Sequence, residues 1–350
     1  MSLPPDDPPT AAPPEPLPAV LAIDGGNSKT DAALVAADGT LLASARGPGV
    51  HSRLTLEEMI GVLGTVARAA AAQAGLPPAG PGTRIARHLS ACVANADLPE
   101  EEQELTEALR AQGWTDTAHV ANDTFAVLRA GLDGPAPHWG VGVTCGAGIN
   151  CVGVAPGGRT TRFLSLGALT GDWGGGYGLG QEAIWWAMRA EDGRGPQTAL
   201  RESVAAHFGE ASMHDLAVAF HTGKLSRDAI IGLVPVLFGA AAGDDGVAAD
   251  IVRRQAEEVS VMALTAIRRL ELGNQPVPVI LGGGVLTARD PLLTSEITRR
   301  LTAGVPLATA RIVDVPPVAG AALLGLDHLG APPAAQARLC AAYPDGTAPL

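Results

Sequence analysis

The stretch Ala19–Arg46 reads AVLAIDGGNSKTDAALVAADGTLLASAR, and its pattern sets the architecture of the chain. Apolar runs separated by turn residues indicate three short strands, AVLAID, TDAALVAA and TLLASAR. Asp38–Gly39 is a typical two-residue hairpin turn between the second and third strands. The first strand instead ends in the turn Asp24–Thr30, so the sequence predicts a β-hairpin with a polar, glycine-containing tip.

The same pattern returns from Trp139 onwards. The strand WGVGVT is followed by the tip Cys145–Asn150, CGAGIN, and then by the strand CVGVA, a Pro156–Gly158 turn and the strand RTTRFLS. Two copies of this unit indicate two related lobes. Helical patterns follow each copy, which favours α/β lobes whose sheets are covered by helices. The predicted helices are Leu56–Gln73, Glu100–Gln112, Gly180–Arg189 and Asp250–Leu272.

Length and composition fit two globular lobes that share a cleft. The chain has 350 residues, of which 47% are hydrophobic and 17% are charged. The net charge is −12, and no run of Lys or Arg is long enough to follow a phosphate backbone. We therefore expect no nucleic acid partner.

The first 17 residues predict a disordered tail. They contain seven prolines and three acids, without the basic and apolar regions of a signal peptide. Charges, Gly or Pro interrupt every apolar stretch before it reaches the length of a membrane span. The four cysteines lack the spacing of a disulfide scaffold. We expect a cytoplasmic protein with reduced thiols and no membrane partner.

The two glycine tips are candidate phosphate-binding loops. A backbone N–H approaches a phosphate most closely where no Cβ intervenes, and two tips facing one cleft would hold a nucleotide from both sides. Each tip alone is equally compatible with a plain hairpin turn. Their matching positions in a repeat favour phosphate binding. Neither matches a P-loop or a strand-to-helix GxGxxG motif.

A third glycine element follows an apolar strand, where Val279–Leu281 runs into Gly282, Gly283 and Gly284. Such a turn would let a flat adenine ring lie on the backbone. A tight connection from strand to helix is the alternative interpretation.

Asp123 is the candidate general base. Phosphoryl transfer to a hydroxyl depends mostly on positioning and charge stabilisation, but a carboxylate must still accept the hydroxyl proton. Asp123 follows closely on the apolar run AHVA, where a strand would deliver it to the cleft. An alternative role is helix capping, with Asp123 or Thr124 capping the segment Phe125–Ala130.

Motifs in one order cover nearly the whole chain: AIDGGNSKTD (22–31), ANDT (121–124), VTCGAGINCVG (143–153), TGDWGGGYGLG (170–180), VILGGGV (279–285) and PPVAGAALLGL (316–326). This ensemble resembles the N-acetylglucosamine kinase family, also called the BadF-type ATPase family, of the actin/hexokinase/Hsp70 superfamily. The resemblance implies a two-lobed actin/hexokinase-like (ribonuclease H-like) α/β fold around an ATP cleft. It also implies a sugar kinase that uses ATP and Mg²⁺, with a homodimer as a possible assembly.

The resemblance also implies lobe boundaries and residue roles. The N-terminal lobe would span 18–121, with a C-terminal helix near 318–330 packing back on it, and the C-terminal lobe 122–317. Asp24 would hold Mg²⁺ through water, and Asp123 would be the catalytic base. Nucleotide and phosphate contacts would come from Gly25, Gly26, Asn27, Ser28, Lys29, Thr30, Thr144, Gly146, Ala147, Gly148 and Gly282–Gly284, and sugar contacts from His51, Asn122, Asp123, Asn150, Asp172 and Trp173.

One loop departs from the family pattern. Relatives commonly read GDEGSG where this chain has Gly171–Gly176, GDWGGG, so Trp173 replaces an acid. An indole would stack on a pyranose ring or fill the volume of an acetyl group, while Asp172 would favour a protonated amine. GDWGGG together with CGAGINC resembles the actinobacterial glucosamine kinases. Glucosamine, phosphorylated to glucosamine 6-phosphate, is thus the predicted substrate, and N-acetylglucosamine is the alternative.

Other interpretations of the chain remain open. Some BadF-type proteins are ATPase activators of a dehydratase, in which each subunit supplies two cysteines to a shared cluster, but Cys92 and Cys340 form no obvious pair. Cys145 and Cys151 are more typical of buried thiols at strand ends than of a zinc site. A chaperone-like or filament-forming ATPase is a further alternative, although little chain remains after the closing helix for a peptide-binding domain.

Overall fold

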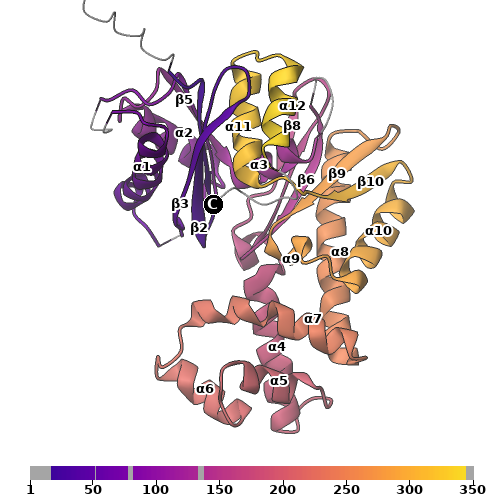
Figure 1. Cartoon of the computed structure of the whole chain (residues 1–350). Helices are drawn as coiled ribbons and strands as arrows, with labels where there is room; N and C mark the ends of the chain where they lie inside the picture. Colours follow the sequence, from indigo (N-terminus) through magenta and orange to yellow (C-terminus); the bar gives the residue numbers. More distant parts are fainter. Residues whose placement is uncertain (1–16, 52, 78–81, 133–137, 344–350) are drawn as a thin grey trace, which may run out of the picture.

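The computed structural model describes residues 17–51, 53–77, 82–132 and 138–343. Two five-stranded sheets are each accompanied by helices, and a group of helices extends away from the second sheet (Figure 1). The predicted tail over residues 1–17 lies outside the described residues, apart from Leu17.

The first sheet has the strand order β3-β2-β1-β4-β5. Strands β1, β2 and β3 are successive antiparallel neighbours, whereas β4 and β5 continue the sheet in parallel on the other side of β1. The pairing of Asp24 with Asp31 confirms the predicted hairpin and its tip. The strands are β1 (Val20–Gly25), β2 (Lys29–Val35), β3 (Leu41–Pro48), β4 (His88–Val93) and β5 (Thr117–Asn122).

The second sheet repeats this topology. Its order β10-β9-β6-β7-β8 puts β6 in the place that β1 has in the first sheet, with two antiparallel strands on one side and two parallel strands on the other. The duplication predicted from the two glycine tips is therefore confirmed. The strands are β6 (Gly140–Cys145), β7 (Ile149–Val154), β8 (Thr160–Arg162), β9 (Val277–Gly282) and β10 (Ala308–Ile312).

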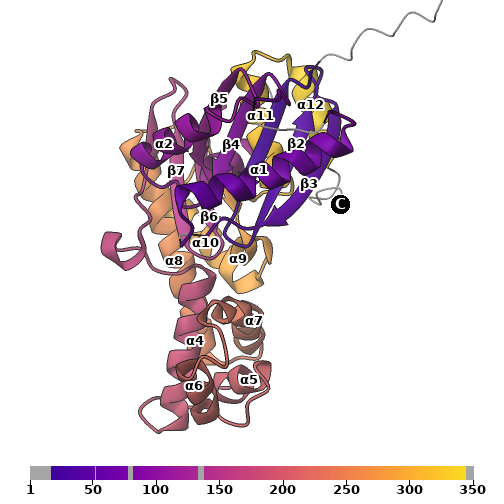
Figure 2. The ribbon, with the colours of Figure 1, turned by 90° about the vertical axis from the view of Figure 1, so that its left-hand side faces the viewer.

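Alternating side chains of β1 enter two different cores. Leu21 and Ile23 pack with residues of helix α1 (Leu56–Gln73), whereas Val20 and Ala22 pack with residues of helix α11 (Pro317–His328). Helices thus cover both faces of the sheet, and for this reason β1 and β4 are buried along their whole length. Figure 2 shows α1 in front of the strands of this sheet.

Helix α11 returns the chain to the first sheet. Ser90 Oγ of β4 donates a 2.6 Å hydrogen bond to the main-chain oxygen of Ala321. A Cβ at Gly320 would overlap the main chain of Ala126, so α11 approaches helix α3 (Asp123–Ala130) very closely. Helix α3 also packs on β6, and it therefore lies between the two sheets. We propose the lobe boundary at residues 121 and 122, just before α3 begins.

The predicted helices are present, and α1 has the predicted bounds. Its first turn is fixed by a capping box between Thr55 and Glu58. Helices α5 to α7 had no counterpart in the prediction, and with α4 they form the extension seen in Figure 1. The further elements are α2 (Pro99–Arg110), η1 (Gly167–Thr170), α4 (Gly175–Glu191), α5 (Leu200–His207), α6 (Met213–His221), η2 (Arg227–Leu233), α7 (Val234–Ala242), α8 (Gly246–Arg269), α9 (Gly284–Thr287), α10 (Pro291–Gly304) and α12 (Pro333–Ala341).

Within the described ranges, no single helix has the length and apolarity needed to cross a membrane. One pair of helical segments, Arg227–Ala242 and Gly246–Arg269, passes that test only when taken together, and it is bent by 117°. Cys92, Cys145 and Cys151 are buried free thiols and Cys340 is a partly buried one. This agrees with the interpretation of Cys145 and Cys151 as buried thiols at strand ends.

Candidate active site

A cavity of about 260 Å³ lies where the two glycine tips and the end of β5 meet. It gathers residues from both lobes, including Asp123 and the second glycine tip. Its predicted site residues are Asn27, Asp123, Thr144, Gly146, Ala147, Gly148 and Asn150, and its unpredicted ones are Ala94, Asn95, Asp97, Ile149 and Ser165.

The first tip is a tight hairpin turn that presents Asn27 to the cavity. Gly26 N–H donates to the main-chain oxygen of Lys29 at 2.9 Å, which closes the turn. The Lys29 ammonium is half exposed and lies 3.0 Å from the Asp31 carboxylate. Thr30 has a fully buried hydroxyl without a hydrogen-bond partner, which is a costly state unless a ligand satisfies it.

The second tip is held from behind by the start of α4. Gly176 N–H donates to the main-chain oxygen of Gly146 at 2.7 Å, and Tyr177 N–H donates to that of Ala147 at 3.0 Å. Gly175 has a φ of 72°, and a Cβ there would lie 2.5 Å from the main chain of Gly148. Only glycine permits this approach, so the sequence GDWGGG shapes the loop that would bind phosphate.

The open side of the second tip is free of steric obstruction. A Cβ built on Gly146 or Gly148 would meet no atom within 4 Å. The hydroxyl of Thr144, just before the tip, is buried and lacks a hydrogen-bond partner, as does that of Thr30 in the first tip. Each lobe therefore brings a glycine turn and an unsatisfied hydroxyl to the same region.

Asp123 begins α3 at the point where β5 ends. The cap of this helix is Asn122, whose Oδ1 accepts the N–H of Thr124 at 3.0 Å. The alternative prediction that Asp123 or Thr124 caps the helix is therefore wrong, because the side chain one position earlier has taken that role. Burial raises the pKa of the Asp123 carboxyl to about 6, although hydrogen bonds from Thr124 pull it down.

Asp24 is a second buried carboxyl near Asp123. Burial raises its pKa to about 8, and the negative charges of Asp123 and Asp31 raise it further, while Lys29 lowers it. A cation between Asp24 and the phosphates of a nucleotide would relieve this unfavourable charge.

The donor set fits Mg²⁺, which prefers oxygen ligands and keeps several waters and substrate phosphates. Carboxylates and the two unsatisfied threonine hydroxyls supply oxygen here. Among the described residues no group of three or more His, Cys, Asp or Glu forms a metal cage. This agrees with a metal held largely through water and phosphate, in which Asp24 would be the nearest carboxylate.

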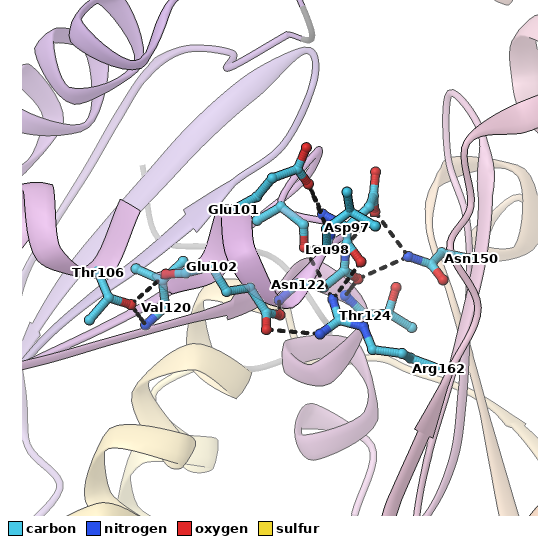
Figure 3. Close-up of polar contacts among 11 residues, drawn as sticks. Asp97, Leu98, Glu101, Glu102, Thr106, Val120, Asn122, Thr124, Asn150 and Arg162 are labelled. Atoms are coloured by element: carbon cyan, nitrogen blue, oxygen red, sulfur yellow. Dashed lines mark hydrogen bonds and ion pairs between the residues drawn. The ribbon is translucent and has the colours of Figure 1, made fainter. Parts of the chain in front are cut away.

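A hydrogen-bonded network of amides and a carboxylate lies beside Asp123 (Figure 3). The Oδ1 atom of Asp97 accepts from Asn122 Nδ2 at 2.9 Å and from Asn150 Nδ2 at 3.3 Å. Asn150 Nδ2 also donates to Asn122 Oδ1 at 3.2 Å. Asn150 belongs to the second lobe and the other two residues to the first, so the network joins the lobes.

Asp97 was missed by the sequence analysis. Burial and the charges of Asp123 and Glu101 raise its pKa to about 7, while Arg162 and a hydrogen bond from Asn122 lower it. The available signal was its position just after β4, because ligands in open α/β sheets bind outside the carboxyl ends of the strands. Asn95, in the same loop, donates to Asn27 Oδ1 at 3.1 Å and so links this loop to the first tip.

Three predicted sugar contacts do not line this cavity. His51 is exposed in the turn after β3. Asp172 is half-exposed at the start of the GDWGGG loop, where Thr170 Oγ1 donates to its Oδ2 at 2.5 Å. The Trp173 ring lies beneath the guanidinium of Arg254, 3.9 Å from ring centroid to Cζ, and lines a separate cavity with Trp186.

The third glycine element is a tight connection from β9 to α9. Gly283 has a φ of 85°, and a Cβ there would lie 2.5 Å from the main chain of Cys145. A Cβ at Gly282 would meet Val127, whereas Gly284 faces open space. The alternative interpretation as a close connection is thus correct for Gly283. A role for this element in adenosine binding remains a prediction.

Comparisons with known proteins place the chain among kinases. An N-acetylmuramic acid/N-acetylglucosamine kinase of Clostridium acetobutylicum is 28% identical over 268 residues, which are 76% of this chain and 85% of that protein. An N-acetyl-D-glucosamine kinase of Dictyostelium discoideum is 26% identical over 210 residues, 59% of this chain and 65% of that protein.

Solved structures share the fold at low sequence identity. A candidate N-acetylglucosamine kinase from Chromobacterium violaceum matches with a TM-score of 0.67 and 24% identity, covering 89% of this chain and 99% of the other. A ROK family glucokinase from Streptomyces griseus, in complex with glucose and AMPPNP, matches with a TM-score of 0.53, 17% identity and coverage of 89% and 98%. The predicted two-lobed actin/hexokinase-like fold is confirmed.

The family model that matches is broader than the individual relatives. It covers residues 21–325, from the first strand through most of α11, and so includes both glycine tips and Asp123. The chain belongs to the BadF/BadG/BcrA/BcrD ATPase family.

Proposed function

We propose that this chain is an ATP-dependent kinase that transfers the γ-phosphoryl group to a hydroxyl of an amino sugar. The observation that carries the proposal is the shared cavity, in which Asp123 lies beside the glycine tip Gly146–Gly148 and opposite Asn27. The names of the relatives support the same reaction class.

Asp123 is proposed as the general base. A base works best when its pKa is close to the working pH while it remains mostly deprotonated. With a pKa of about 6, the Asp123 carboxylate is ionised at neutral pH and more basic than an exposed aspartate. It would accept the proton of the sugar hydroxyl as the new P–O bond forms. Asn122 holds the main chain at this point through its cap on Thr124.

The two glycine tips are proposed to bind the phosphates of ATP. The buried hydroxyls of Thr30 and Thr144 would gain the partners that they lack. Bound Mg²⁺ would neutralise phosphate charge and orient the γ-phosphoryl group. The carboxylate of Asp24 would orient water towards that ion, and its own unfavourable burial as an anion would be offset.

N-acetylglucosamine is the first sugar to test. Two relatives act, by their names, on N-acetylated sugars. Trp173 lies outside the cavity, so its indole leaves the space there for an acetyl group. Asp97, Asn122 and Asn150 offer the carboxylate and amide groups that hydrogen-bond sugar hydroxyls.

Glucosamine, predicted from the GDWGGG loop, is the second candidate. The acids Asp97 and Asp123 in the cavity are the observation that favours it, because a carboxylate pairs with the ammonium of a free amino sugar.

The test is ADP release by the purified chain with ATP and Mg²⁺, measured with N-acetylglucosamine, glucosamine, N-acetylmuramic acid and glucose in parallel. We expect kcat/KM for one amino sugar to exceed that for glucose by about tenfold or more. ATP hydrolysis that no sugar stimulates would contradict the proposal, and would favour an ATPase of the dehydratase-activator type.

A further inference from the structure

A charged pair joins the two lobes next to the cavity. Arg162, at the end of β8 in the second lobe, donates from Nη1 to Oε2 of Glu102 in the first turns of α2 at 2.8 Å. The two side chains are 22% and 17% exposed, so solvent screens this pair far less than a surface pair. Figure 3 shows Arg162 reaching from its strand towards the segment that carries Asp97.

The remaining hydrogen bonds of this pair end on residues beside the candidate base. Arg162 Nη2 donates to the main-chain oxygen of Asp97 at 2.9 Å and to that of Ala96 at 3.3 Å. Glu102 Oε1 accepts the main-chain N–H of Asn122 at 2.8 Å. The pair therefore fixes the main chain of both Asp97 and Asn122, and Asn122 directly precedes Asp123.

The side chains held in this way are the ones that face the proposed sugar. Asn122 and Asp97 hydrogen-bond to each other and to Asn150 of the second lobe. Without the guanidinium, the loop at Asp97 would lose its fixed distance from β8. A displacement of about 1 Å at a reacting centre typically costs about 10²-fold in rate.

Stability alone is a poor explanation of the pair. Buried ion pairs lose about as much by desolvation as they gain by attraction. Arg159, near the other end of β8, makes the contrasting contact: it reaches Glu271 and the main-chain oxygen of Leu270, both in the second lobe, and the pair is exposed.

We infer that Arg162 and Glu102 are positioning residues for phosphoryl transfer, which hold the sugar-facing edge of the first lobe in register with the second. This inference rests on the function proposed above. It assigns these two side chains a role through Asp97 and Asn122, and no contact of their own with substrate.

The kinetic test compares Arg162→Met with Arg159→Met. We expect kcat for sugar phosphorylation to fall by about 10²-fold in R162M and to stay within about threefold in R159M. The KM for ATP should stay within about threefold in both variants, since neither side chain borders the glycine tips. Equal kcat in R162M and R159M would overturn the inference.

A second pair of variants separates positioning from folding. Glu102→Gln keeps an acceptor for the N–H of Asn122, so it should retain more activity than Glu102→Ala, by about tenfold. Glu107→Gln is the matched control, because Glu107 is an exposed residue of the same helix and accepts a hydrogen bond from Gln103. Losses in E102Q and E102A that simply follow their melting temperatures would indicate a structural role only, and would also overturn the inference.

Hydrogen exchange tests the contacts without any assay of activity. Peptides that cover residues 94–98 and 120–124 should exchange faster in R162M than in the wild type and in R159M. Unchanged exchange in R162M overturns the inference even if no sugar proves to be a substrate. Conversely, a wild-type chain without sugar phosphorylation, together with faster exchange in R162M, refutes the proposed function and retains the coupling of the lobes.

Discussion

At the scale of single residues, the cavity owes its chemistry to buried carboxyls that few cations accompany. Asp24, Asp97 and Asp123 all have raised pKa values, first because of burial and, for Asp24 and Asp97, also because of the charge of Asp123. Groups perturbed in this way and gathered in one cavity are typical of sites that bind a cation or move a proton. Nearby aspartates without this role have partners instead, as Asp31 has in Arg46, at 2.6 Å.

Replacing Asp123 by Asn tests the general base. Asparagine keeps the shape and one acceptor but takes up no proton, so kcat should fall by about 10²–10⁴-fold while sugar affinity stays within a few-fold. In the wild type, kcat/KM should rise with pH through about 6, since the base must lose its proton to act. Near-normal turnover of D123N in a steady-state assay would remove Asp123 from this role.

Replacing Trp173 by Phe tests its part in sugar choice. Its ring packs under Arg254 in a cavity apart from Asp123, so the ratio of kcat/KM for glucosamine and N-acetylglucosamine should change by less than about threefold. A change of about tenfold or more would show that the indole discriminates between the two sugars, as expected from the sequence, despite its position here.

At the scale of elements, glycine has two different functions in the turns of this chain. Gly175 and Gly283 have positive φ values and lie where another main chain leaves no space for a Cβ. Gly146 and Gly148 have open space around them, on the side of the cavity. The first kind is needed for the fold, whereas the second leaves room for a ligand.

The substitution Gly148→Val should therefore weaken nucleotide binding without unfolding the chain. The branched side chain would occupy the cavity where phosphate is expected, and we predict that ATP affinity falls by about tenfold or more. Gly283→Val should instead lower the melting temperature markedly, because its Cβ would overlap Cys145. Calorimetric titration of ATP and a thermal melt of both variants provide the measurements. Normal ATP affinity in a folded G148V would make the second tip a plain turn.

The elements were more predictable than their contacts. The strands, both glycine tips and the bounds of α1 follow from apolar period and turn residues, which are local properties. Asp97 and Arg162 escaped notice because their roles depend on partners far along the chain, such as Asn122 and Glu102. Trp173 lies away from the cavity because Arg254, on the distant helix α8, offers its ring a partner.

At the scale of the whole molecule, the duplicated sheets meet at one helix and one polar network. Helix α3 packs against α11 of the first lobe and β6 of the second, while Asp97, Asn122 and Asn150 connect the lobes at the cavity. A further ion pair, Arg53 with Asp228, spans from the first lobe to the helical extension, but it is exposed and contributes little. The tightest couplings between the lobes are therefore those nearest to Asp123.

The same buried carboxyls should make the stability of the ligand-free chain fall between pH 6.5 and 8. A carboxyl with a folded pKa of about 8, as for Asp24, or about 7, as for Asp97, keeps a proton that it loses on unfolding. The folded state then binds more protons than the unfolded state, so the free energy of unfolding decreases as pH rises towards these values. His88 has the opposite effect, because burial lowers its pKa to about 4, but that contribution is complete by its ordinary value of 6.5.

Thermal melts at constant ionic strength, from pH 6.5 to 8, measure this dependence. We expect the melting temperature to fall by about 2–5 °C over that range in the wild type. Asp24→Asn removes the carboxyl with the most strongly raised pKa, so its melting temperature should fall less steeply. Glu57→Gln, at an exposed acid of α1, should keep the wild-type slope and serves as the control. A melting temperature that is constant or rises between pH 6.5 and 8 in the wild type would show that Asp24 and Asp97 are ionised in the empty site. The carboxylates would then need no cation to stabilise their charge, and the argument for Mg²⁺ beside Asp24 would lose its electrostatic basis.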